Sequence, residues 1–201
     1  MAKVKICGIT RIEDIYAVNH ALPDYIGFVF AKSTRQVDRD TAAKLKSELD
    51  KRISAVGVFV NHSIDEITSL AMDGIIDIVQ LHGEEDDDYI GELRKSWGGP
   101  VIKSAGIGKA MPKLSASADY MLFDTKSKQR GGTGRAFDWA ILEGYKGSSF
   151  FLAGGLNQSN IIQAIKKCNP FAVDISSGAE TDGIKDYDKI QSLIGLVRGN
   201  I

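Results

Sequence analysis

The sequence predicts an α/β protein in which residues 1–201 form a single domain, a closed (β/α)8 barrel. Three observations lead to this prediction. Short apolar runs rich in β-branched and aromatic residues occur eight times along the chain, and helical periodicity follows them. The repeat is about 25 residues long, which suits parallel strands joined by right-handed crossovers. A chain of 201 residues can bury one sizeable core.

The apolar runs define eight expected strands, at residues 4–7, 25–30, 53–60, 76–81, 101–104, 120–124, 149–153 and 171–175. The segments between them define the expected helices, at residues 11–21, 38–49, 63–72, 84–97, 137–142, 157–167 and 186–197, with a weaker pattern at 109–117. Ser63 and Glu66 match a capping box. The acidic run 84–88 is expected to open a helix as a solvated cap, since its consecutive carboxylates cannot converge on one metal ion.

An open, doubly wound sheet is the rival architecture. Such a sheet usually carries a nucleotide-binding turn. The segment 132–137 (GTGRAF) lacks the third glycine of a dinucleotide fingerprint and lies too far from its strand, and no GxxxxGK[ST] motif occurs. These absences favour the closed barrel.

Composition limits the function classes. Lys and Arg number 25 against 26 Asp and Glu, and without a basic block we expect no nucleic-acid partner. No apolar stretch approaches membrane-spanning length, so no membrane partner is expected either. The first residues lack the apolar core of a signal peptide, which predicts a cytoplasmic location. Cys7 and Cys168 form no metal-binding or disulfide pattern and are expected to be free thiols.

Polar residues at the strand ends are the candidates for chemistry, because a (β/α)8 barrel places its active site there. Strand periodicity turns Cys7 and Asp124 inward at the barrel mouth. By the same reasoning, Gln80 shares a face with His82, and Asp174 faces the same interior. Four strands therefore direct polar groups to a common region.

Each candidate also has an ordinary structural explanation. A lone buried cysteine such as Cys7 usually serves as a small hydrophobe, and an aspartate such as Asp124 often only forms a turn. His82 could simply hydrogen-bond its own loop. Lys5 faces inward and could pair with Asp174, since neither charge is tolerated alone inside the barrel.

Glycine-bearing turns follow the seventh and eighth expected strands. They contain Gly155 in the first turn, and Ser176, Ser177 and Gly178 in the second. The loops at these two positions are where this fold repeatedly holds a phosphate, which favours a phosphorylated substrate. A third loop, residues 126–134, is basic and glycine-rich and could be a lid or a plain connection.

The motifs together resemble one family, phosphoribosylanthranilate isomerase, and the resemblance runs almost from end to end. The family's opening KICGxT is matched by KICGIT at residues 5–10. The other matching segments are GFVFAKSTR (27–35), VGVFVN (56–61), VQLHG (79–83), FD (123–124) with GGTG (131–134), LAGGL (152–156) and VDISSG (173–178). Two departures are mild: Ala179 stands where valine is usual, and residues 181–183 replace a proline-containing turn.

The resemblance implies an Amadori rearrangement of N-(5-phosphoribosyl)anthranilate, a small phosphosugar substrate, in tryptophan biosynthesis. It implies that no cofactor and no metal are required. Cys7 is then the general base and Asp124 the general acid, while Arg35 binds the anthranilate carboxylate. The two glycine-bearing turns hold the phosphate, and Gln80, His82 and Asp174 contact the rest of the substrate. A monomer or a homodimer is expected.

Three rival functions stay open at this point. The nearest is a related sugar-phosphate isomerase of histidine biosynthesis, or an enzyme with both activities, but these typically carry an aspartate where this chain has Cys7. A non-catalytic phosphate-binding barrel is the second rival, and a subunit of a larger tryptophan-pathway assembly is the third. Intact Cys7, Asp124 and Arg35 argue against loss of catalysis.

Overall fold

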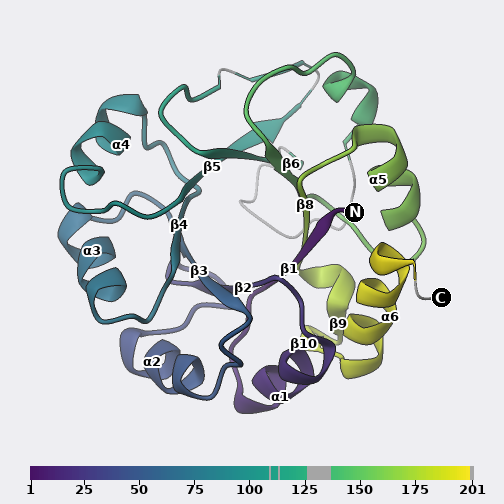
Figure 1. Cartoon of the computed structure of the whole chain (residues 1–201), viewed down its shortest axis with the longest axis horizontal. Helices are drawn as coiled ribbons and strands as arrows, with labels where there is room; N and C mark the ends of the chain where they lie inside the picture. Colours follow the sequence, from purple (N-terminus) through teal and green to yellow (C-terminus); the bar gives the residue numbers. More distant parts are fainter. Residues whose placement is uncertain (109, 113, 126–136, 200–201) are drawn as a thin grey trace.

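Eight parallel strands close into a barrel in a computed structural model that describes residues 1–108, 110–112, 114–125 and 137–199. Neighbouring strands in the sequence are neighbours in the barrel, and the eighth strand pairs with the first (Figure 1). The strands are β1 (Lys3–Cys7), β2 (Tyr25–Val29), β3 (Ser54–Phe59), β4 (Ile78–Leu81), β5 (Val101–Ile107), β6 (Tyr120–Thr125), β7 (Phe150–Leu152) and β8 (Ala172–Ile175). The predicted fold class is therefore confirmed.

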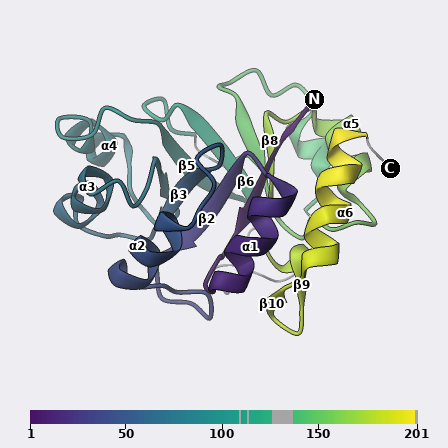
Figure 2. The ribbon, with the colours of Figure 1, turned by 60° about the horizontal axis from the view of Figure 1, so that its bottom comes forward.

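A ring of helices surrounds the barrel (Figure 1). The α-helices of the described residues are α1 (Ile12–Ala21), α2 (Arg39–Ser47), α3 (Ile64–Met72), α4 (Asp87–Leu93), α5 (Ile161–Cys168) and α6 (Tyr187–Arg198). Figure 2 shows α1 and α6 side by side, where the chain closes on itself. The capping box predicted at the start of α3 is present, since Ser63 and Glu66 each accept the other's backbone N–H.

Two of the predicted α-helices are not found: one segment contains no helix in its described residues, and the other contains only a 3-10 turn. Residues 110–112 and 114–117 contain no helix, because Pro112 interrupts the pattern and the Ser115 hydroxyl accepts the N–H of Ala118 instead. The segment predicted at 137–142 contains only the 3-10 turn η1 (Trp139–Leu142). The helical layer is therefore incomplete after β5 and β6 within the described residues.

The acidic run before α4 divides into two parts. Asp86 caps the helix by accepting the N–H of Tyr89 at 2.9 Å, as predicted. Glu85, however, is buried and pairs with Lys103 at 3.0 Å, so its assignment to a solvated cap is wrong. It also accepts the N–H groups of Asn61 and Gly83, which compensate for its burial and join two loops at the mouth.

The apolar core has two layers, and strand periodicity sorts residues between them. Val4, Ile6, Met121 and Phe123 pack outward into the layer between barrel and helices, as predicted. A second cluster fills the barrel interior: Tyr25, Val56, Ile78, Ile102, Leu122, Phe151, Ala153 and Ala172. Because interior positions alternate with outward ones, the residues that end β1, β4, β6 and β8 on the interior face reach the mouth.

A short hairpin follows the eighth strand. After β8 come the 3-10 turn η2 (Ser177–Ala179), then β9 (Glu180–Thr181) and β10 (Ile184–Lys185), which pair antiparallel before α6 begins. Figure 2 shows this hairpin at the N-terminal end of α6, beside α1. The sequence pattern did not predict it.

Candidate active site

A cavity of about 750 Å³ lies at the carboxyl ends of the strands. Every site residue expected from the sequence lines it except Gly178: Cys7, Arg35, Gln80, His82, Asp124, Gly155, Asp174, Ser176 and Ser177. Gly178 lines an adjoining cavity together with Gly155 and Ser177. The structure therefore brings the predicted residues together at one mouth.

A buried ion pair forms the floor of this cavity. Lys5 Nζ lies 2.9 Å from Asp174 Oδ2, with both side chains at most 8% exposed, so the pairing predicted for the barrel interior is confirmed. Burial opposes the charge on Lys5, but Asp174 and Cys7 outweigh it and raise its pKa. The other carboxylate oxygen, Asp174 Oδ1, is buried and accepts no hydrogen bond from the described residues.

Cys7 ends β1, and its sulfur lies against the backbone of β2. A Cβ on Gly27 would come within 2.6 Å of the Cys7 Sγ, so the absence of a side chain at Gly27 makes the space for the thiol. Burial raises the pKa of Cys7, while the charges of Lys5 and Lys185 act to lower it. The free site therefore favours the protonated thiol.

Asp124 ends the inward face of β6 on the same mouth. Burial raises the pKa of this carboxyl to about 6, and the nearby charge of Asp174 adds to the shift. A hydrogen bond from the Thr125 N–H to Asp124 Oδ1, 2.6 Å long, opposes it. A carboxyl with this pKa is protonated in about one molecule in ten at pH 7, far more often than an ordinary aspartate, so it can serve as a general acid.

His82 lies beside Asp124 at the mouth as a neutral imidazole. Burial lowers its pKa to about 4, and the charge of Lys5 contributes in the same direction. Its ring nitrogens lie 3.3 Å from Gln80 Nε2 and 3.5 Å from the Ser104 hydroxyl, and Nε2 lies 3.9 Å from Asp124 Oδ2. These partners come from the strands, so His82 is held against the barrel.

Arg35 reaches the mouth from the loop after β2. Its guanidinium donates from Nε and Nη2 to the two oxygens of Glu180, at 2.7 and 2.6 Å. Glu180 in turn binds the buried Lys185. Sequence reasoning missed both Glu180 and Lys185, because the hairpin that presents them has no motif of its own and lies 145 positions from Arg35.

The two glycine-bearing turns both line the mouth cavity. The side-chain amides of Asn157 and Asn160 both donate to the Gly155 carbonyl, at 3.1 and 3.0 Å, which fixes the first turn. The second turn contains Ser176 and Ser177, which line the same cavity. This arrangement is compatible with an anion held between the turns.

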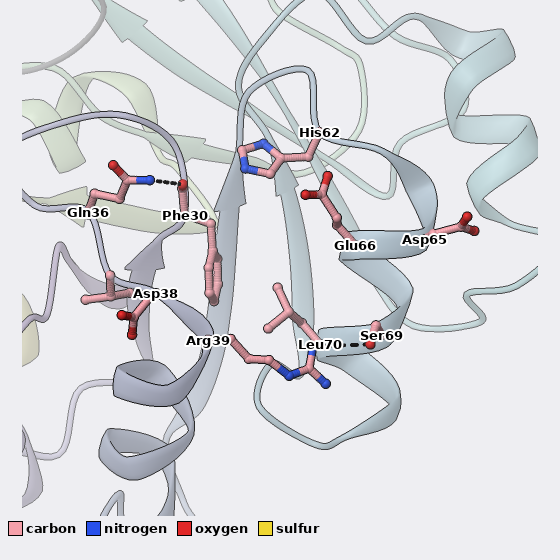
Figure 3. A pocket seen from close by; sticks show the side chains of 10 residues that line it. Phe30, Gln36, Asp38, Arg39, His62, Asp65, Glu66, Ser69 and Leu70 are labelled. Atoms are coloured by element: carbon pink, nitrogen blue, oxygen red, sulfur yellow. Dashed lines mark hydrogen bonds between the residues drawn. The ribbon is translucent and has the colours of Figure 1, made fainter.

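A second cavity lies outside the mouth, between α2 and α3 (Figure 3). In Figure 3, Phe30 and Leu70 form its apolar side, while His62, Glu66 and Arg39 surround it. Phe30 and His62 also line the mouth cavity, so the two spaces adjoin. None of the expected site residues lines this second cavity.

Further findings concern metal binding, the thiols, the membrane and the loop 126–134. In the described ranges, no group of three or more His, Cys, Asp or Glu residues is placed to hold a metal ion. Cys7 and Cys168 are free thiols. No helix among the described residues has the length and apolarity to span a membrane. The loop 126–134, expected to be a lid or a connection, lies outside the described residues.

A carboxyl whose pKa is raised to about 6 and a thiol share the mouth of a closed (β/α)8 barrel, beside a guanidinium and two glycine-bearing turns. This combination defines a (β/α)8-barrel enzyme of the acid–base type. The model of the N-(5'-phosphoribosyl)anthranilate (PRA) isomerase family matches residues 4–195. The chain belongs to this family.

Individual relatives agree with the family match. The chain is 49% identical to the N-(5'-phosphoribosyl)anthranilate isomerase of Endomicrobium trichonymphae over 98% of this chain and 99% of the relative. It resembles the monomers generated from the dimeric Thermotoga maritima enzyme, at 33% identity and a TM-score of 0.81, covering 99% of this chain and 100% of that one. A second similar structure is the isomerase bound to reduced 1-(o-carboxyphenylamino)-1-deoxyribulose 5-phosphate, at 33% identity and a TM-score of 0.79, covering 99% of this chain and 100% of that one.

Proposed function

We propose that this chain converts N-(5-phosphoribosyl)anthranilate to 1-(2-carboxyphenylamino)-1-deoxyribulose 5-phosphate in L-tryptophan biosynthesis, with Asp124 as the general acid and Cys7 as the general base. The observation that carries the assignment is that a carboxyl and a thiol line one mouth and that nearby charges act on both of them. Asp124 has its pKa raised to about 6, and two buried ammonium groups act on the thiol of Cys7. The family match supports the reaction.

The chemistry needs one proton donor and one proton acceptor. Asp124 protonates the ribose ring oxygen, the C1–O bond breaks, and the nitrogen lone pair forms the C1=N iminium. Cys7, as the thiolate, removes the proton from C2, and the C–H electrons form the C1=C2 bond of an enolamine. Tautomerisation to the C2 ketone completes the isomerisation. Cys7 is left protonated and Asp124 ionised, so one proton returns from the thiol to the carboxylate between turnovers.

The free site stores that single proton on the thiol. Near neutral pH, Asp124 is largely ionised, whereas Cys7 is protonated because burial raises its pKa above the ordinary value of a thiol. The reactive arrangement moves the proton from Cys7 to Asp124. Both arrangements contain one proton in the pair, so activity follows the population of the singly protonated pair.

The remaining groups bind the substrate. We assign the anthranilate carboxylate to Arg35, because a planar guanidinium meets a carboxylate with two parallel hydrogen bonds. The phosphate is assigned to Gly155, Ser176, Ser177 and Gly178 in the two converging turns. Gln80, His82 and Asp174 are assigned to the hydroxyl groups and the linkage. The buried oxygens Gln80 Oε1 and Asp174 Oδ1 support this last assignment, because neither is paired within the described residues.

Steady-state turnover tests the proposed function. Freshly prepared N-(5-phosphoribosyl)anthranilate is added to the protein with a chelator present and no cofactor added, and the loss of anthranilate-type fluorescence is followed. We expect turnover under these conditions. A folded protein, checked by circular dichroism, that leaves the substrate unchanged would contradict the proposal. Activity that appears only after a metal or cofactor is supplied would contradict the two-group mechanism.

We further infer that residues 1–201 form one domain, which acts as a monomer or homodimer in the cytoplasm. The barrel uses strands from Lys3 to Ile175, and α6 packs against α1, so the two ends of the chain meet in one unit. A reducing compartment suits a base that must remain a free thiol. Size-exclusion chromatography with light scattering measures the mass in solution, and a mass above that of a dimer would contradict the inference.

A further inference from the structure

We propose that Glu180 and Lys185, in the β9–β10 hairpin, are positioning residues that hold Arg35 and the turn after β8 in one rigid arrangement. This inference rests on the proposed function, in which Arg35 and that turn bind the two anionic ends of the substrate. The hairpin would then set the distance between the two anion-binding groups before substrate arrives. The supporting contacts are those of Arg35, of Lys185 and of the hairpin itself.

The side chain of Arg35 is confined on two sides. Its aliphatic part runs over Gly8, where a Cβ would lie 2.5 Å from the Arg35 Cδ and the backbone has a φ of +85°. Its guanidinium is fixed by Glu180, which is 5% exposed against 24% for Arg35. Glu180 takes the edge formed by Nε and Nη2. A guanidinium has five N–H donors, so the edge formed by Nη1 and Nη2 can receive the carboxylate of a substrate.

Lys185 links the carboxylate of Glu180 to the second anion-binding group, the turn after β8. Its side chain is 2% exposed and donates to Glu180 Oε1 and, at 3.2 Å, to the carbonyl oxygen of Ser176. One buried ammonium group therefore touches both the partner of Arg35 and the turn assigned to the phosphate. Glu180 thus has two cationic partners, which compensate for the desolvation of its charge.

The hairpin itself is anchored to the barrel wall. In the β9–β10 register, Lys185 lies directly opposite Glu180, so their side chains share one face of the ladder. The Thr181 hydroxyl donates to Asp186, which caps α6, at 2.6 Å, and Lys189 from α6 donates to the Glu180 carbonyl at 2.7 Å. Because α6 packs on α1 and β1, these contacts tie the hairpin to the part of the wall that contains β1.

Lys185 also acts on the base. Burial raises the pKa of the Cys7 thiol, and the charge of Lys185 opposes that shift. Burial lowers the pKa of Lys185, and the charges of Glu180 and Cys7 oppose it. The hairpin therefore supplies a second positive charge near Cys7, in addition to Lys5. Loss of this charge is expected to raise the pKa of Cys7 further, so that fewer molecules carry the thiolate. This change can be measured without any substrate.

The first test compares two substrates. Kinetics are measured with N-(5-phosphoribosyl)anthranilate and with N-(5-phosphoribosyl)aniline, which lacks only the carboxylate. For Arg35→Met and Glu180→Gln, we expect kcat/KM to fall by about tenfold or more for the first substrate and to stay within about threefold for the second. The double variant is expected to lose no more than Arg35→Met alone, because Glu180 acts through Arg35.

Other outcomes would overturn the inference. An equal loss on both substrates for Glu180→Gln alone would show a general structural role, and no loss on either would show that Arg35 needs no support. If Arg35→Met itself fails to distinguish the substrates, the proposed role of Arg35 is wrong and the inference falls with it. Glu143→Gln, at a 66%-exposed carboxylate paired with Lys167, is the matched control and is expected to match the unmodified protein.

The second test needs no turnover. Alkylation of Cys7 by iodoacetamide is followed across pH by mass spectrometry of its peptide, in the unmodified protein and in Lys185→Met. We expect the variant to react about threefold or more slowly at the same pH, because fewer molecules carry the thiolate. An unchanged rate of alkylation would overturn the inference that the charge of Lys185 favours the thiolate of Cys7. Should Lys185→Met unfold, Glu180→Asp retains the charge but shortens the reach to Arg35, and the substrate comparison is repeated with it.

Discussion

Lys5 Nζ lies 2.9 Å from Asp174 Oδ2 at the floor of the mouth, and the charges of this pair act on the three titrating side chains above it. The charge of Lys5 lowers the pKa of Cys7, Asp124 and His82, and that of Asp174 raises all three. Since both members are buried, each charge depends on the other. The pair therefore supports the fold and the chemistry together.

Breaking this pair is expected to destabilise the barrel strongly. In Lys5→Met, Asp174 is left as a buried carboxylate without its partner, and we expect the free energy of unfolding to fall by about 3–5 kcal/mol. Urea unfolding measures the change. The double variant Lys5→Met with Asp174→Asn is expected to be more stable than Lys5→Met alone, and Lys95→Met, in an exposed pair with Glu92, to change little. Equal stability of Lys5→Met and the unmodified protein would contradict this account.

The acid limb of the pH profile reports the pair of Cys7 and Asp124. Below the Asp124 pKa of about 6, both groups hold protons and no base is present. We expect kcat/KM to rise with pH through a midpoint near 6 and then to stay level until the thiol ionises. A value of kcat/KM that stays constant from pH 5 to pH 7 would contradict the proposal that only the singly protonated pair of Cys7 and Asp124 is active.

Asp124→Asn is expected to stabilise the fold while abolishing most activity. The folded-state pKa of Asp124 lies above the ordinary value, so the stability that the group contributes at low pH is lost as pH rises from about 4 to about 6. An amide does not ionise. Above pH 6, the variant is therefore expected to exceed the unmodified protein by about 1–3 kcal/mol in urea unfolding, with the difference disappearing below pH 4. A variant less stable at pH 8 would contradict the raised pKa.

Gly27→Ala tests the space that holds the thiol. A Cβ there would lie 2.6 Å from the Cys7 Sγ, so we expect the sulfur to be displaced and kcat to fall by about tenfold or more. Gly91→Ala in α4 is the matched control, because no atom lies within 4 Å of its added Cβ. The control is expected to keep full activity. Full activity in Gly27→Ala as well would show that the position of the sulfur is not critical.

The sequence predicted the barrel and the inward groups for the same reason. Strand periodicity is a local property, so the eight apolar runs and the orientation of Cys7 and Asp124 could both be read from it. The helix expected at 109–117 is absent from residues 110–112 and 114–117, because Pro112 outweighs the weak apolar pattern. The burial of Glu85 could not be predicted, since it depends on Lys103 from another strand.

The contacts of Arg35 within the protein also could not be predicted from the sequence. The family resemblance assigned it a substrate carboxylate but gave no protein partner. Glu180 becomes its partner only because a two-residue ladder turns Glu180 and Lys185 to one side after β8. Such short strands have too few residues for any periodic pattern. Long-range ion pairs of this kind follow from the closed barrel and have no local signature.

The central claim is that Asp124 and Cys7 together perform the proton transfers, and turnover of Cys7→Ala, Asp124→Asn and the double variant tests it most directly. We expect kcat to fall by about 10² or more in each single variant, and the double variant to lose little beyond the more impaired single one. Cys168→Ala controls for loss of a thiol elsewhere, and circular dichroism checks the fold. Near-normal turnover in either folded single variant would contradict the account.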